Sequence, residues 1–131
     1  MLPIVVIVGR SNVGKSTLFN RLTRFRKALV GDVPGLTRDR HFGEVKFGKF
    51  NFLIVDTGGF EPNSREALQS HMSRQTEEAV FEADIIIFLV DGRSGIVSGD
   101  HNISKLLRKT GKPVYLVVNK LEGITLSLIH I

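Results

Sequence analysis

Cysteine is absent from this chain of 131 residues, and so is tryptophan. Without cysteine the chain has no disulfide bond and no thiolate metal site, which suits an intracellular protein. No apolar run approaches the about 18 residues that a membrane-spanning helix needs, and the first residues lack the pattern of a secretory signal. We therefore expect a single cytoplasmic domain with no membrane span, large enough to bury a core without covalent cross-links.

Charge and histidine placement are weak guides to the function of this chain. Lysine and arginine outnumber the acidic residues 18 to 13, and basic side chains gather at residues 21–27 and 105–112. Such stretches favour phosphate-bearing partners such as RNA, but solvated helix faces explain them about equally well. The four histidines are scattered without the spacing of metal ligands. A nucleotide-independent RNA-binding module therefore stays open as one interpretation.

The segment from Gly9 to Ser16 reads Gly-Arg-Ser-Asn-Val-Gly-Lys-Ser and fits the pattern G-x-x-x-x-G-K-[ST]. An apolar run at residues 2–8 predicts a buried strand before it, and apolar spacing over residues 17–24 predicts a helix after it. Between a strand and a helix, backbone N–H groups and the positive helix end form a cup for a di- or triphosphate. Lys15 is predicted to reach the β- and γ-phosphates, and the Ser16 hydroxyl to bind Mg2+. A plain turn, in which the glycines only reverse the chain, is the alternative.

Predicted strands and helices alternate along the rest of the chain. Strands are expected at residues 42–47, 50–55, 85–90 and 114–118, and helices at residues 64–82 and 100–109. The dipeptide Gly48-Lys49 between the first two of these strands indicates a hairpin. The order predicts an α/β fold of the P-loop NTPase kind, with a mostly parallel sheet, one antiparallel edge strand and helices on both faces. Ligands of such sheets bind beyond the carboxyl ends of the strands.

Two further motifs stand at predicted strand ends. Asp56 closes a strand as a Walker-B acid does, where it supports Mg2+ through an ordered water, although a turn aspartate is the plainer alternative. In Asn119-Lys120-Leu121-Glu122, the Asn amide can engage the O6/N7 edge of guanine, the Lys stem can cover the ring, and the carboxylate can accept from N1–H and the 2-amino group. Adenine offers a lone pair there instead, which predicts a preference for guanine of about 10⁴. An ATP-binding P-loop enzyme is the alternative.

These motifs resemble those of translation-factor-class GTPases, and their wording is closer to one family, the bacterial ribosome-assembly GTPase Der, also called EngA. The segments that carry the resemblance are Gly9–Leu22, Val33–Arg40, Asp56–Gly59 and Asn119–Glu122, and they are similar to the first of the two G domains of that family. The similarity runs from about residue 2 to Gly123. It implies binding of GTP and GDP, hydrolysis of GTP with Mg2+, and action in assembly of the large ribosomal subunit, with rRNA as a partner of the full-length protein.

The resemblance also implies roles for single residues. Catalysis would rest on Lys15, Thr37 and Asn12, where Thr37 orders the first switch around Mg2+ and the γ-phosphate and Asn12 helps to hold K+. As plain loop residues, Asn12 and Thr37 need no such roles. Phe60 follows Gly59 where many GTPases have a glutamine that orients the attacking water, so electrostatic stabilisation must contribute more. The implied metal ligands are Ser16, Thr37 and Asp56. The implied nucleotide-binding residues are Gly9, Asn12, Val13, Gly14, Lys15, Ser16, Thr17, Asp56, Gly59, Asn119, Lys120 and Glu122.

Three departures from the family pattern accompany the resemblance. Ser11 stands where members usually have proline, and Glu122 stands where most GTPases have aspartate, which we expect to preserve specificity for guanine. Residues 124–131 match nothing in the family, so we expect a partial G domain over residues 1–123 that is truncated after the fourth motif. The second G domain and the KH-like domain of the family are missing from this sequence. An incomplete sheet exposes an edge, which predicts a dimer or a swap of the tail between copies.

Overall fold

The computed structural model describes residues 2–10, 13–23, 41–57, 74–93, 95–120, 123–124 and 129–130. The strands in these ranges are β1 (Ile4–Val8), β2 (His41–Phe47), β3 (Phe50–Asp56), β4 (Ile85–Asp91), β5 (Val114–Lys120), β6 (Gly123–Ile124) and β7 (Ile129–His130). The helices are α1 (Lys15–Leu22), α3 (Arg74–Glu82) and α4 (Ser98–Lys109). None of these described helices combines the length and the apolar character that crossing a bilayer requires.

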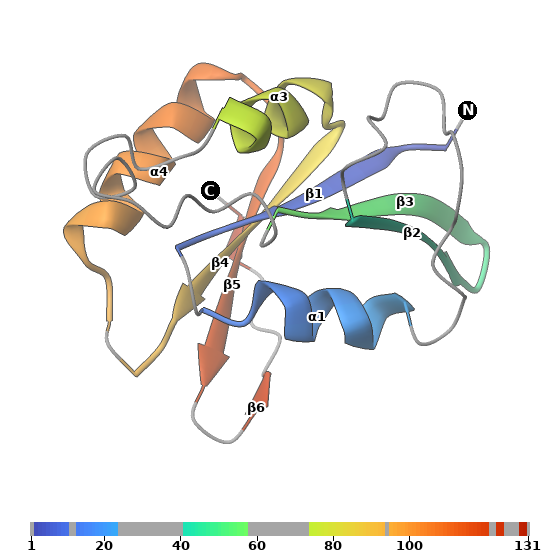
Figure 1. Ribbon diagram of the computed structural model, residues 1–131, viewed down its shortest axis with the longest axis horizontal. Coiled ribbons are helices and arrows are strands. Elements are labelled where there is room, and N and C mark those ends of the chain that lie inside the picture. The colour runs from blue at the N-terminus through green and yellow to red at the C-terminus, as the bar shows by residue number, and fades with distance from the viewer. Residues whose placement is uncertain are drawn as a thin grey trace.

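The strands form one sheet in the order β2-β3-β1-β4-β5-β6, with β7 also paired to β5 (Figure 1). β1 runs parallel to β3 and β4, and β5 runs parallel to β4, whereas β2 pairs antiparallel with β3 at one edge. The predicted α/β fold, with its mostly parallel sheet and antiparallel edge strand, is therefore confirmed. Because β1, β3, β4 and β5 are parallel, their carboxyl ends meet at the same end of the sheet.

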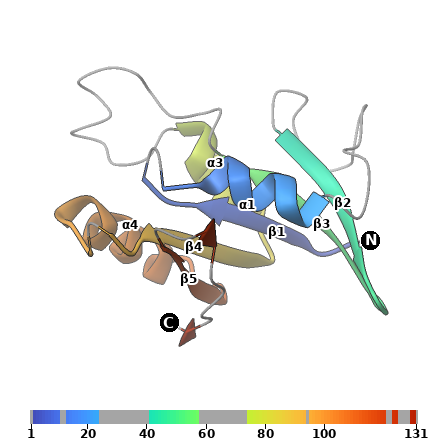
Figure 2. The ribbon, with the colours of Figure 1, turned by 90° about the horizontal axis from the view of Figure 1, so that it is seen from below.

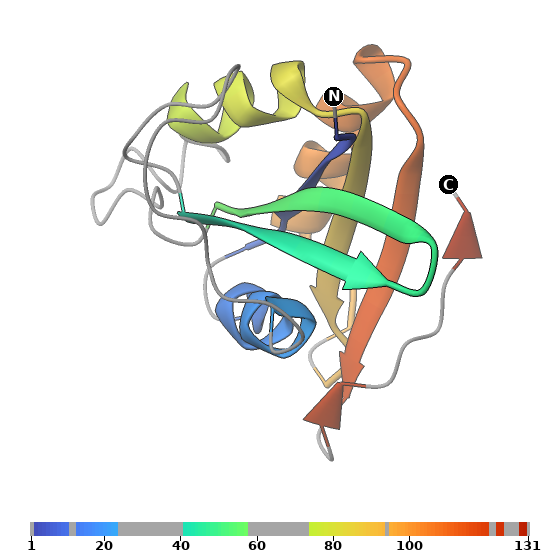
Figure 3. The same ribbon diagram turned by 90° about the vertical axis from the view of Figure 1, so that its right-hand side faces the viewer.

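Helices cover both faces of the sheet, with α1 on one face and α3 and α4 on the other (Figures 1 and 3). Figure 2 shows α1 along its face of the sheet, next to β1. All five residues of β1 are buried. Val6 and Val8 pack in the apolar cluster that includes residues of α3 and α4, whereas Ile7 packs with Leu18 of α1. Since successive side chains of a strand point to opposite faces, the unbroken apolar run at β1 is what a strand covered on both faces needs.

Several elements have bounds that differ from those that the sequence pattern predicts. The helix expected at residues 17–24 lies two residues earlier, from Lys15 to Leu22, and α4 begins at Ser98 rather than at Asp100. Strand β5 continues past residue 118 because Asn119 still pairs with Asp91 of β4. Of the helix predicted at residues 64–82, the part that the structure describes is α3, and the rest lies outside the described residues. The extension of β5 places the first two residues of the Asn119 motif on the sheet itself.

Two short antiparallel strands beyond β5 are an addition that the sequence did not predict. In β6, Gly123 and Ile124 pair with Lys120 and Asn119, while β7 pairs further back along β5. Pairs of two residues are too short to show the alternation that identifies a strand in a sequence. These strands occupy part of the β5 edge within the same chain. Exchange of this segment between copies stays a prediction.

Lys112, just before β5, forms hydrogen bonds to α3 at the amino-terminal end of the parallel strands. Its Nζ donates to the carbonyl oxygens of Val80, at 2.8 Å, and of Phe81, and it lies 5.5 Å from the centre of the Phe81 ring. Burial lowers the pKa of Lys112, and the nearby carboxylates of Asp84 and Glu82 oppose that shift. Lys112 therefore satisfies carbonyl groups that the last turn of a helix leaves without partners.

Candidate nucleotide site

The loop between β1 and α1 is shaped by two glycines that approach other elements closely. A Cβ atom built on Gly9 would lie 2.4 Å from the carbonyl oxygen of Leu89 in β4. Gly14 precedes α1 in a left-handed conformation with φ of 103°, and a Cβ atom there would lie 2.5 Å from Nδ2 of Asn119. Both contacts leave room for hydrogen alone, so these glycines do more than reverse the chain.

The first turn of α1 begins directly after Gly14 and includes no acidic side chain. Gly14 has no side chain that could cap the helix, and its backbone oxygen accepts the helical bond from Leu18 N at 3.0 Å. The first N–H groups of a helix lack partners within the helix and carry its positive end. Helix N–H groups next to a glycine loop are suited to bind the oxygens of an anion.

Lys15 lies folded over this loop and is only 4% exposed. Its Nζ donates to the carbonyl oxygen of Gly9 at 2.6 Å and to that of Arg10 at 3.2 Å. Burying an ammonium group is costly unless hydrogen bonds compensate for the lost water, and these two carbonyls supply such compensation. The structure therefore keeps a positive charge at the loop where the sequence predicts phosphate binding.

Ser16 and Asp56 are brought together although they are 40 positions apart in the chain. Ser16 Oγ donates to Asp56 Oδ2 at 2.8 Å. Asp56 ends β3 and is 1% exposed, whereas Ser16 in the first turn of α1 is exposed. A hydroxyl and a carboxylate are hard oxygen ligands, so the pair fits Mg2+, which keeps several waters and takes few ligands from protein. No group of three or more His, Asp or Glu side chains that could hold a metal occurs among the described residues.

Asn119 joins the end of β5 to the loop before α1. Its Nδ2 donates to the carbonyl oxygen of Val13 at 2.8 Å, and its backbone oxygen accepts from Gly92 N at 2.7 Å. The motif predicted to recognise a base is therefore in direct contact with the loop predicted to bind phosphates. Neither contact could be read from the spacing of the motif along the chain.

Thr57 is a supporting residue that the sequence argument did not single out. Its side chain is fully buried, and its Oγ1 donates to the carbonyl oxygen of Ile7 at 2.7 Å. The bond links the residue after β3 to β1, next to the pairing of Ile7 with Asp56. The only signal in the sequence is a hydroxyl residue directly after a strand-ending aspartate, which is also common in turns.

The structure thus gathers Gly9, Val13, Gly14, Lys15, Ser16, Asp56 and Asn119 at the carboxyl ends of β1, β3 and β5. Thr17 belongs to α1 and Lys120 to β5. Four other predicted site residues lie outside the described residues, namely Asn12, Thr37, Gly59 and Glu122, as does Phe60.

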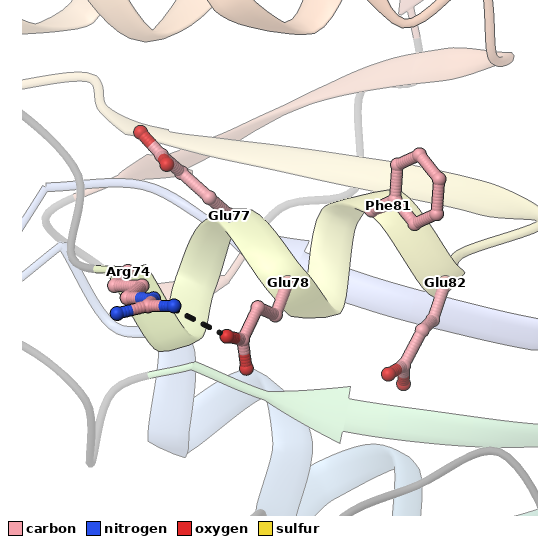
Figure 4. A pocket seen from close by; sticks show the side chains of 5 residues that line it. All are labelled: Arg74, Glu77, Glu78, Phe81 and Glu82. Carbon is pink, nitrogen blue, oxygen red and sulfur yellow. Dashed lines mark ion pairs between the residues drawn. The ribbon is translucent and has the colours of Figure 1, made fainter.

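A hollow of about 320 Å³ lies apart from this site, on the outer side of α3. Its lining residues are Arg74, Glu77, Glu78, Phe81 and Glu82 (Figure 4). Arg74 and Glu78 form an ion pair at 3.6 Å on the solvent-exposed side of the helix. Because three of the five lining side chains are carboxylates, the hollow disfavours a phosphate. The glycine loop is therefore the better candidate for a nucleotide.

A family model, curated relatives and solved structures all support a nucleotide site at the glycine loop. A family model described as "50S ribosome-binding GTPase" matches residues 4–120. The proteins named GTPase Der from Burkholderia cenocepacia and Burkholderia vietnamiensis are 59% identical to this chain over 123 residues, which are 94% of this chain. The chain spans only 28% of the length of these relatives. The resemblance to the N-terminal G domain of Der is confirmed.

Solved structures agree with the fold. The structure of Era in complex with MgGDPNP and a segment of 16S ribosomal RNA has a TM-score of 0.70 and 32% identity, covering 92% of this chain and 41% of Era. The cytosolic domain of FeoB from L. pneumophila has a TM-score of 0.63 and 30% identity, covering 88% of this chain and 45% of that domain. The glycine loop and strand-end residues of this chain thus lie on a GTPase fold, and the family match over residues 4–120 shows that the chain belongs to the 50S ribosome-binding GTPases.

Proposed function

We propose that this chain is a GTP-binding and GTP-hydrolysing switch domain, and that it acts in assembly of the large ribosomal subunit as part of a longer cytoplasmic protein. The contact between Ser16 Oγ and Asp56 Oδ2, at 2.8 Å, carries the proposal. This hydrogen bond joins the first turn of α1 to Asp56 at the end of β3, beside the buried Lys15. Such an arrangement is what a metal-bound nucleoside triphosphate requires. The large ribosomal subunit, with its rRNA, is proposed as the partner on the basis of the family.

The phosphates are proposed to lie at the start of α1. Backbone N–H groups of Val13, Gly14 and Lys15 would donate to the phosphate oxygens, and the Lys15 ammonium would neutralise charge on the β- and γ-phosphates. In this structure that ammonium is held by the carbonyls of Gly9 and Arg10, within the same loop. A short movement of its long side chain would bring it to the phosphates.

Ser16, Asp56 and Thr37 are proposed as the protein oxygens around Mg2+. The Ser16 hydroxyl would bind directly, while Asp56 would orient a water and accept from Ser16 as it does here. When bound, Mg2+ neutralises the charge that develops on the β- and γ-phosphates. From the family resemblance we infer a further role for Asn12, which would hold K+ beside the phosphates. With Phe60 in place of a glutamine, hydrolysis would depend on Lys15, Thr37 and Asn12.

The base is proposed to lie against Asn119, Lys120 and Glu122. Asn119 would serve two purposes in this arrangement, because its amide nitrogen carries two N–H donors. One donates to Val13 O, and the other would donate to the O6/N7 edge of guanine, whose two atoms are acceptors. The carboxylate of Glu122 would accept from N1–H and the 2-amino group of guanine. The proposed base site is thus built on the end of β5.

Calorimetric titration with GDP and with ADP in the presence of Mg2+ tests the proposal. We expect GDP to bind more tightly than ADP by about 10⁴, and Glu122→Ala to reduce this preference because the variant removes the acceptor for the 2-amino group. Equal affinity for the two nucleotides would support an ATP-binding P-loop enzyme instead. Binding of rRNA fragments with no affinity for GDP would support a nucleotide-independent RNA-binding module.

Ser16→Ala is expected to lower the rate of GTP hydrolysis by about 100-fold, because a metal ligand worth several kcal/mol of charge stabilisation is removed. The affinity for GDP should also become less sensitive to Mg2+, which a titration with and without a chelator measures. Ser98→Ala is the matched control, since Ser98 is likewise exposed in the first turn of a helix, α4, but lies outside the proposed site. Hydrolysis by Ser16→Ala at the rate of the Ser98→Ala variant would count against the metal assignment.

A further inference from the structure

Arg10 and Asp100 form a charged pair between the glycine loop and α4. Arg10 Nε donates to Asp100 Oδ1 at 2.8 Å, across 90 positions of the chain. The Asp100 side chain is 1% exposed and that of Arg10 is 28% exposed. The second oxygen of the carboxylate, Oδ2, accepts from Val97 N at 3.0 Å and so caps the start of α4. A buried carboxylate with both oxygens bonded in this way has one defined orientation.

The stem of the Arg10 side chain packs along the first turn of α4. A Cβ atom built on Gly99 would lie 3.1 Å from Cδ and 3.6 Å from Cγ of Arg10. The first of these distances is shorter than an ordinary van der Waals contact, so a side chain at Gly99 would push the Arg10 stem aside by a few tenths of an ångström. Arg10 is thus held by packing as well as by its hydrogen bond.

The backbone of Arg10 continues this connection toward the phosphate loop. Its carbonyl oxygen accepts from Lys15 Nζ at 3.2 Å, beside the carbonyl of Gly9 at 2.6 Å. Arg10 therefore contacts α4 with its side chain and Lys15 with its backbone. A loop with two glycines has high conformational freedom, and an anchor of this kind restricts it.

We propose that Asp100 and Arg10 are a positioning pair through which α4 fixes the conformation of the phosphate loop and of Lys15. The inference deepens the proposed function, on which its effect on nucleotide affinity rests. Asp100 acts through Arg10, and Arg10 acts through its own carbonyl, which accepts from Lys15 Nζ. The ordering of the loop itself requires no nucleotide, so it can be tested separately.

The variants Arg10→Met and Arg10→Gln distinguish the effect of the hydrogen bond to Asp100 from the effect of the packing of the Arg10 stem. The Gln amide nitrogen stands as many bonds from the backbone as Arg Nε and can donate to Asp100, whereas the Met methyl group at that position cannot. In nucleotide-free protein, we expect amide hydrogen exchange at residues 13–16 to become about tenfold faster in Arg10→Met. Arg10→Gln should stay within about threefold of the unchanged protein, because one hydrogen bond to a charged group remains.

Titration with GDP should follow the same order. The affinity is expected to fall about tenfold in Arg10→Met and to be largely restored in Arg10→Gln, since a loop that must be ordered on binding lowers the affinity. Arg74→Met is the matched control, because it breaks the exposed Arg74–Glu78 pair of α3, and it should leave both measurements unchanged.

Gly99→Ala tests the Arg10–Asp100 pair by a change in α4 that alters neither member of the pair. It is the variant to measure if Arg10→Met does not fold. Alanine favours the helix over glycine, so α4 itself should gain stability. The added methyl group shifts the Arg10 stem and so weakens its bond to Asp100, and exchange at residues 13–16 should therefore become about threefold faster. Opposite changes in helix stability and loop protection are not expected from a merely structural role.

Three results would overturn the inference. They are unchanged loop exchange in Arg10→Met, an Arg10→Gln variant no better than Arg10→Met, and a lower melting temperature with no change at the loop. A failure of the proposed function looks different, because the unchanged protein would then not bind GDP while the exchange results still followed the order expected for the pair.

Discussion

Lys15→Met is expected to lower the affinity for GDP by at least about 100-fold, because it removes charge-assisted bonds to the phosphates worth about 3 kcal/mol. Methionine keeps an apolar stem at a position that is 4% exposed, so loss of packing contributes little. The carbonyls of Gly9 and Arg10 also lose their donor, which should loosen the loop. Isothermal titration measures the affinity, and a thermal melt of the nucleotide-free protein measures the structural part.

Lys112→Met is a close control for this experiment. Lys112 also donates from Nζ to two backbone carbonyl oxygens, those of Val80 and Phe81, but at the opposite end of the sheet. We expect it to lower the melting temperature while leaving the affinity for GDP unchanged. If Lys15→Met and Lys112→Met had the same effect on GDP binding, the phosphate role of Lys15 would be wrong.

Gly14→Ala is expected to lower the affinity for GDP by about 100-fold or more and to destabilise the fold. Alanine at a positive φ costs about 1 kcal/mol in itself. At Gly14 the methyl group would also lie 2.5 Å from Asn119 Nδ2, so the bond from Asn119 to Val13 O must shift. The substitution thereby disturbs the phosphate loop and the base motif together. Titration with GDP and a denaturant unfolding curve check the two effects.

Gly111→Ala is the control for Gly14→Ala, because it introduces the strain of a positive φ without a steric contact to another residue. Gly111 has φ of 70°, and a Cβ atom there would meet nothing within 4 Å. We therefore expect a loss of about 1 kcal/mol in stability and no change in GDP affinity. Affinity within about threefold of the unchanged protein in Gly14→Ala would contradict the proposed geometry of the loop.

The sequence predicted those features that arise from local patterns. The apolar run of β1, the glycine loop and the strand that ends in Asp56 each follow from a few neighbouring residues, and the parallel sheet then brings their ends together. The meeting of Ser16 with Asp56 could be expected on that basis. The first residue of α1 could not be predicted in this way, because the apolar spacing begins only at Leu18. The helix begins earlier, at Lys15, directly after the left-handed conformation of Gly14.

Contacts between distant side chains were beyond the reach of these patterns. The bond from Asn119 to Val13 spans 106 positions and that from Arg10 to Asp100 spans 90. Arg10 and Asp100 are ordinary charged residues in a loop and in the first turn of a helix, where solvent exposure is the usual outcome. Only the packing of α4 against the loop reveals that Asp100 is buried and needs a cationic partner.

The buried hydroxyl of Thr57 has a consequence for how this domain changes shape. Its bond to Ile7 O, at 2.7 Å, fastens the end of β3 to the central strand. Asp56 and Thr57 therefore move with β1 as one rigid unit. In the proposed switch, a rearrangement between the diphosphate and the triphosphate complex would therefore leave these two residues with the sheet, and the carboxylate proposed to face Mg2+ would be the stationary reference for that motion.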